Sequence, residues 1–104
     1  MVTKFQLYID FQSANMRAGD LERAANRLRK VAESALLDEL HDISVNWTGD
    51  ASAAFIRKGY ELKDKLLAEA KSLEASAETI RRIAKRTYDT EMKALEKANC
   101  RIYH

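Results

Sequence analysis

The stretch Asn46-Trp47-Thr48-Gly49, close to the midpoint of the chain, constrains the fold more than any other. It holds the only Trp and one of three Gly, and the 104 residues contain no Pro. Gly accepts backbone angles that other residues resist, so it can end a helix where the chain must reverse. The bulky Trp closes the end of an apolar stripe. We therefore expect a turn at residues 46–50.

Apolar residues recur every three to four positions on both sides of this turn, which is the period of an amphipathic helix. The pattern predicts helices over residues 10–45 and 51–97. Asp10 is a suitable N-cap for the first helix, or Asp20 if Gly19 delays its start, and Thr48 or Asp50 suits the second. Residues 5–9 alternate apolar and polar side chains, so we expect residues 1–9 to form an extended arm. We expect residues 98–104 to form a tail after the second helix.

These expectations describe one all-α domain, a helical hairpin of two long antiparallel helices. A hairpin this thin buries little surface, and Leu37, Ile56, Leu67 and Ile83 lie beside its predicted stripe. Pairing of two hairpins into a four-helix bundle would cover these side chains, so we predict a dimer. The expected core and dimer stripe consists of Leu21, Leu28, Leu36, Leu40, Ile43, Phe55, Leu62, Leu66, Leu73 and Ile80.

Composition argues against several classes of function. The net charge is only +2, too small to indicate a nucleic-acid partner, and no apolar run is long enough to span a bilayer. Cys100 is alone, and His41 and His104 are the only histidines, so no metal site, cofactor or catalytic group is predicted. We expect no enzyme and no small-molecule substrate. One basic cluster stands out, and we interpret it as a solvated face rather than an anion-binding surface: Arg81, Arg82, Lys85 and Arg86.

The Trp47-Thr48-Gly49 motif, centred between two uninterrupted amphipathic helices, resembles the WXG-motif family of small early-secretory-antigen-like proteins of bacterial type VII secretion. The resemblance covers nearly all of residues 9–95. Ile9-Asp10 looks like the family's entry into its first helix, and Phe55 is similar to an aromatic residue in the family's second helix. Trp47 and Gly49 correspond to the motif that gives the family its name.

Members of this family carry an export signal on the second helix, a Tyr followed four residues later by Asp or Glu. Tyr88 is in the corresponding region but has Met92 at that spacing, while Glu91 follows at three residues and shares a helix face with it. The resemblance assigns a degenerate signal to Tyr88 and Glu91. Tyr60 and Asp64 match the spacing but lie early in the helix.

The resemblance implies a non-enzymatic substrate or adaptor that is exported as a folded dimer, without a cleavable signal peptide, after residence in the cytoplasm. Its partners would be a second copy or a similar hairpin, together with the secretion ATPase. An alternative within the same system is a small helical partner that binds the N-terminal helical domain of a larger toxin. A further alternative is a cytoplasmic coiled-coil adaptor unrelated to export.

Overall fold

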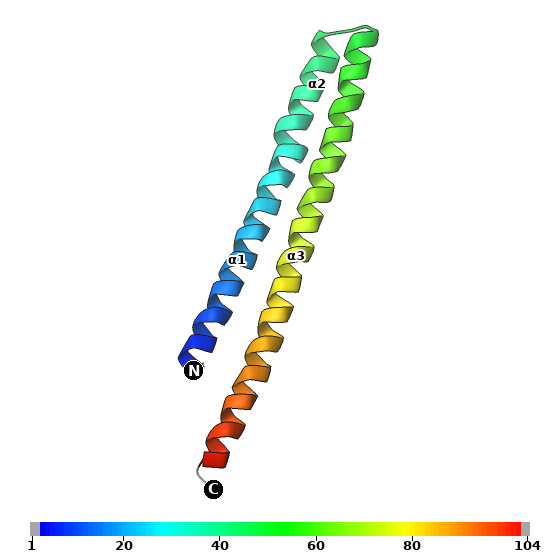
Figure 1. The fold of residues 1–104 in the computed structure, drawn as a ribbon. Helices are drawn as coiled ribbons and strands as arrows, with labels where there is room; N and C mark the ends of the chain where they lie inside the picture. The colour runs from blue at the N-terminus through cyan, green and yellow to red at the C-terminus, as the bar shows by residue number, and fades with distance from the viewer. Residues whose placement is uncertain (1–2, 103–104) are drawn as a thin grey trace. The chain divides into compact units, whose positions relative to one another are not determined.

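The computed structural model describes residues 3–102, and these form a helical hairpin with no strand among them. The helices are α1 (Lys4–Lys30), α2 (Leu36–Asn46) and α3 (Asp50–Ile102), with a π-helical turn, η1 (Val31–Ala35), between α1 and α2. As Figure 1 shows, a short connection after α2 leads into α3. The all-α hairpin predicted from the sequence is therefore confirmed.

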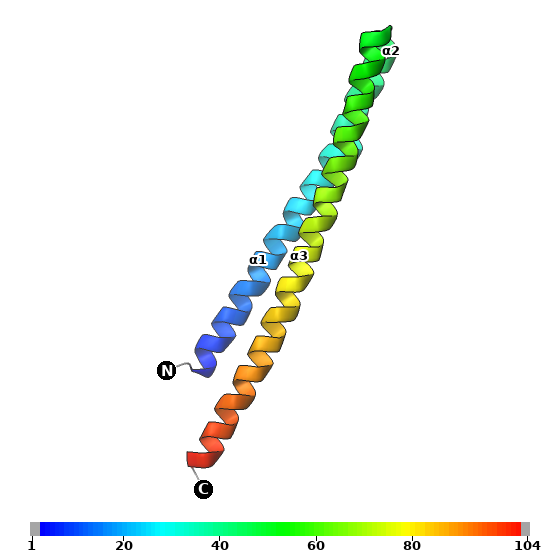
Figure 2. The same ribbon diagram turned by 45° about the vertical axis from the view of Figure 1, so that its right-hand side comes forward.

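The chain divides into two compact units, which are described separately. Unit 2 comprises residues 22–74 and contains the end of α1, η1, α2, the turn and the first half of α3. Unit 1 joins residues 3–21 to residues 75–102, so it contains the start of α1 and the second half of α3. In each unit the two helical segments lie side by side and run in opposite directions (Figures 1 and 2).

Helix α1 begins at Lys4, so the predicted extended arm at residues 1–9 is wrong for the described residues 4–9. The N-cap is Thr3 rather than Asp10, because the Gln6 backbone N–H donates to Thr3 Oγ1 at 3.0 Å. Asp10 instead lies inside the helix and accepts a hydrogen bond from the Gln6 side chain at 2.9 Å. Thr3-x-x-Gln6 has the spacing of a capping box, and this cap outweighs the strand-like alternation that follows it.

At the other end of the chain, α3 continues to Ile102, so the predicted tail is wrong for residues 98–102. No Gly or Pro follows Gly59, and nothing in the sequence therefore stops the helix near residue 97. Residues 103–104 lie outside the described part of the chain.

The π-helical turn explains how one face of a long helical run stays apolar. From Ala18 to the start of η1, the apolar positions follow one another at alternating steps of three and four residues: Ala18, Leu21, Ala25, Leu28 and Ala32. Continuing those steps would place Ala35, Glu39, Asp42 and Asn46 on the core side. The apolar side chains come one residue later, at Leu36, Leu40, Ile43 and Trp47. The Leu36 N–H bonds to the Val31 carbonyl, five residues back, so η1 absorbs the extra residue.

Small side chains fill most of the contact between the helices. In unit 2, Ala25, Ala32 and Ala70 are fully buried, and Leu40 is the largest fully buried side chain. In unit 1, Ala18 and Ala77 are fully buried. Because alanine has only one methyl group, facing helices can approach closely, and larger side chains are displaced toward the edges of the contact. Many large apolar groups therefore stay partly exposed.

Candidate interaction surface

The turn of unit 2 has the geometry expected of a helix end. Trp47 caps α2 in an extended conformation, with φ −135° and ψ 123°, and its N–H bonds to the Ile43 carbonyl at 2.9 Å. Gly49 has φ +111°, the only positive φ among the described residues, and this conformation favours Gly over residues with a β-carbon. The Gly49 carbonyl accepts the Ala53 N–H at 3.0 Å, so Gly49 occupies the N-cap position of α3, where Thr48 or Asp50 was expected.

Ser52 ties the two sides of this turn together. Its hydroxyl donates to the Trp47 carbonyl at 2.7 Å, and its side chain is almost fully buried. The spacing of apolar residues does not identify Ser52. The sequence signal that could identify it is a small polar side chain two positions into a helix that follows a Gly turn.

Trp47 is packed on one side and open on the other. Its ring lies 6.1 Å from that of Phe55, centroid to centroid, at an interplanar angle of 56°. Trp47 nevertheless remains 45% exposed and Phe55 54% exposed. An aromatic pair that is only half covered is typical of a surface that binds another protein.

An apolar groove runs from this aromatic pair along unit 2. It has a volume of about 260 Å³ and is lined by Leu36, Leu40, Phe55, Lys58, Gly59 and Leu62. Leu36 and Leu40 form the wall from α2, and the other lining residues come from α3. Lys58 is the only charged residue among them.

The predicted stripe separates into residues that fill the hairpin and residues that face outward. Leu40 is buried, whereas Phe55 and Leu62 are about half exposed and cover the hairpin contact only in part. The remaining seven are partly buried: Leu21, Leu28, Leu36, Ile43, Leu66, Leu73 and Ile80. Of the four apolar residues predicted to stay wet in a monomer, Ile83 is 57% exposed, while the other three are partly buried.

The degenerate export signal lies in unit 1. The ring of Tyr88 packs against that of Phe11 on α1, with centroids 5.0 Å apart. Tyr88 is therefore part of the hairpin contact. Glu91 is exposed.

The basic cluster borders a shallow, open depression of unit 1, lined by Arg82, Lys85, Arg86, Asp89 and Thr90. Lys85 pairs with Asp89 at 2.9 Å, whereas the side chains of Arg82 and Arg86 have no partner among the described residues. Arg81 is partly buried and does have a partner.

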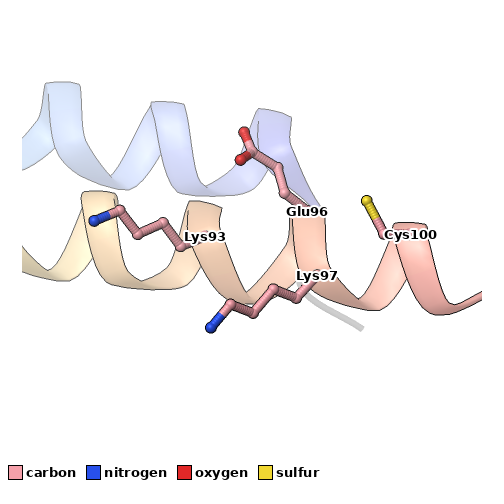
Figure 3. A pocket seen from close by; sticks show the side chains of 4 residues that line it. All are labelled: Lys93, Glu96, Lys97 and Cys100. Carbon is pink, nitrogen blue, oxygen red and sulfur yellow. The ribbon is translucent and has the colours of Figure 1, made fainter.

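A second depression lies near the end of α3. Figure 3 shows Lys93, Glu96, Lys97 and Cys100 along its border, with the side chains spread apart rather than converging on one point. The Cys100 thiol is free and exposed. No donor set for a ligand is assembled there.

Within residues 3–102, no three His, Cys, Asp or Glu side chains are grouped so that they could hold a metal ion. In the same part of the chain, no helix is both long and apolar enough to cross a membrane. Comparison of the chain with protein-family models, curated proteins and solved structures finds no match. The half-exposed aromatic pair and the adjoining groove are therefore the surface best suited to binding a partner protein.

Proposed function

We propose that this chain is a small non-enzymatic substrate or adaptor of a bacterial type VII secretion system. It acts as a folded dimer of helical hairpins that the secretion ATPase recognises. The proposal rests on the resemblance of Trp47-Thr48-Gly49 to the family motif, and one structural observation carries it further: Trp47 stands half exposed beside Phe55, where the hairpin turns. A Trp needed only for folding would be expected to be covered.

The geometry supports a recognition role in two ways. The Ser52 hydrogen bond to the Trp47 carbonyl holds the backbone from which the indole projects, and a fixed backbone lowers the entropy lost on binding. The groove beside Phe55 offers apolar surface for a partner's side chains. Partly exposed aromatic side chains over fixed backbone are typical of binding hot spots.

Secretion by the native host tests the proposal directly. The protein should accumulate in the culture medium of a strain with an intact secretion ATPase and remain in the cells of a strain lacking it. Trp47→Ala should reduce the secreted fraction while the intracellular protein stays helical by circular dichroism. Val45→Ala is a matched control, because Val45 is also an exposed apolar residue at the end of α2.

Equal secretion with and without the ATPase would contradict the proposal. Normal secretion of Trp47→Ala, together with loss of secretion in Val45→Ala, would show that the half-exposed indole is not the recognition element.

A further inference from the structure

The chain carries two oppositely charged segments. Residues 33–50 contain no Lys or Arg and five carboxylates: Glu33, Asp38, Glu39, Asp42 and Asp50. Residues 81–101 contain three carboxylates and seven basic residues: Arg81, Arg82, Lys85, Arg86, Lys93, Lys97 and Arg101. The acidic segment belongs to unit 2 and the basic segment to unit 1.

Among the described residues the acidic segment has no ion pair, and the basic segment is only partly neutralised, because Arg81 has a partner and Lys85 pairs with Asp89. All five carboxylates of the acidic segment belong to exposed residues, and none forms an ion pair with the described residues. In the basic segment, Arg82 and Arg86 are exposed and likewise unpaired, and they lie four residues apart on one face of α3. Two complementary sets of unpaired charge in one chain favour contact between copies.

Apolar features accompany both charged segments. Glu39 follows Leu36, a lining residue of the groove, by three residues, so the two share a face of α2, and Asp42 follows Glu39 by three more. Ile83 is 57% exposed and shares a face of α3 with Arg86. The groove volume of about 260 Å³ is large enough to admit a branched aliphatic side chain.

We propose that a second copy of this chain inserts Ile83 into the groove between Leu36 and Leu62, with its Arg82 and Arg86 facing Glu39 and Asp42. The reciprocal contact closes a two-fold symmetric pair, in which each copy supplies one groove and one basic segment. This inference deepens the dimer part of the proposed function by naming the surfaces that meet.

Charge reversal provides a test in which loss and rescue are both defined. Arg82→Glu/Arg86→Glu places acidic against acidic segments in its own dimer, and Glu39→Lys/Asp42→Lys places basic against basic. Each double variant alone should raise the dimer dissociation constant about tenfold or more, measured by sedimentation. Mixed together, the two variants have opposite charges at both contacts and should form a heterodimer about as tight as the parent dimer.

Further variants separate this effect from net charge and from folding. Lys65→Glu/Lys71→Glu changes the net charge by the same amount as Arg82→Glu/Arg86→Glu, at exposed positions outside both segments, and its dimer should resemble that of the parent. Ile83→Asp should weaken the dimer, whereas Ile83→Leu should not. Raising the salt from about 0.05 to about 0.5 M should weaken the parent dimer, because exposed charges are screened. Circular dichroism must show unchanged helicity in every variant.

A parent chain that remains monomeric at all concentrations would overturn the inference. A dimer that resists charge reversal, or a mixture of the two double variants that does not associate, would also overturn it. These outcomes are distinct from failure of the proposed function, because dependence of secretion on the ATPase is measured independently of dimer affinity.

Discussion

Leu40 packs directly onto the backbone of Gly59. A β-carbon placed on Gly59 would overlap the Leu40 Cδ2 atom and lie 3.0 Å from its Cδ1 atom. Leu40 is also the largest fully buried side chain, so the one large residue in the centre of unit 2 occupies space that a Gly on α3 leaves open. Elsewhere in this unit the same closeness depends on alanines.

This contact predicts that Gly59→Ala destabilises the protein, against the helix preference of Ala. Ala is favoured over Gly by about 1 kcal/mol inside a helix. Overpacking against Leu40 should cost about 1–3 kcal/mol and exceed that gain. Urea unfolding followed by circular dichroism measures the difference.

A double-mutant cycle isolates the cause. Leu40→Ala alone should cost about 2–5 kcal/mol by leaving a cavity. In that background, Gly59→Ala should become neutral or stabilising, because its methyl group no longer meets Leu40. An equal cost of Gly59→Ala in both backgrounds would mean that the two residues are not coupled.

The π-helical turn predicts that the first half of the hairpin tolerates a deletion. Removing Ser34 from η1 restores the alternation of three and four residues from Ala32 through Trp47 without an irregular turn. The variant should be at least as stable as the parent in thermal unfolding. Removing Glu69 is the matched control, because α3 is an unbroken α-helix there and the deletion rotates its apolar stripe off the core. If both deletions destabilise equally, η1 does not serve to correct the register.

The helices and the turn could be predicted from the sequence because they depend on local signals. Steps of three and four residues identify the helices, and Gly49 marks the reversal. The capping box at Thr3 is also present in the sequence, but the five-residue alternation of apolar and polar side chains that follows it favours a strand. One shifted step between Ala32 and Leu36 indicated the π-helical turn, yet a stripe described only by its average period conceals such a shift.

The candidate surface was less predictable, because it depends on the alignment of α3 against α2. Leu62 and Leu66 have the same residue type and both belong to the stripe, but one is half exposed and the other partly buried. Their difference follows from which residues of the opposite helix lie across from them. Contact of Leu40 with Gly59 has the same origin, and the spacing of either helix alone contains no information about it.

Gly49 predicts a backbone effect that involves no side-chain contact. Its φ of +111° is strained for any residue with a β-carbon, although a β-carbon there would meet no atom within 4 Å. Gly49→Ala should therefore cost about 1–3 kcal/mol through the backbone alone. Thr48→Ala is the control, since Thr48 is exposed and has no positive φ, and it should change stability by less than about 0.5 kcal/mol. Equal stability of Gly49→Ala and the parent in urea unfolding would show that the turn can adopt another conformation.

Substitutions of Tyr88 and Glu91 should have different effects on stability, although both belong to the proposed export signal. Its ring contacts Phe11, so Tyr88→Ala should cost about 1–3 kcal/mol of stability, whereas Tyr88→Phe keeps the ring and should be nearly neutral. Glu91 is exposed, and Glu91→Ala should leave thermal unfolding unchanged. If the proposed export signal includes both residues, Glu91→Ala lowers secretion without loss of stability, while Tyr88→Ala lowers both secretion and stability.

Phe11→Ala completes the comparison, because it removes the same ring contact and leaves Tyr88 in place. A secretion defect as large in Phe11→Ala as in Tyr88→Ala, with Glu91→Ala secreted normally, would assign Tyr88 to the hairpin core and place the export signal elsewhere, on this chain or on its partner.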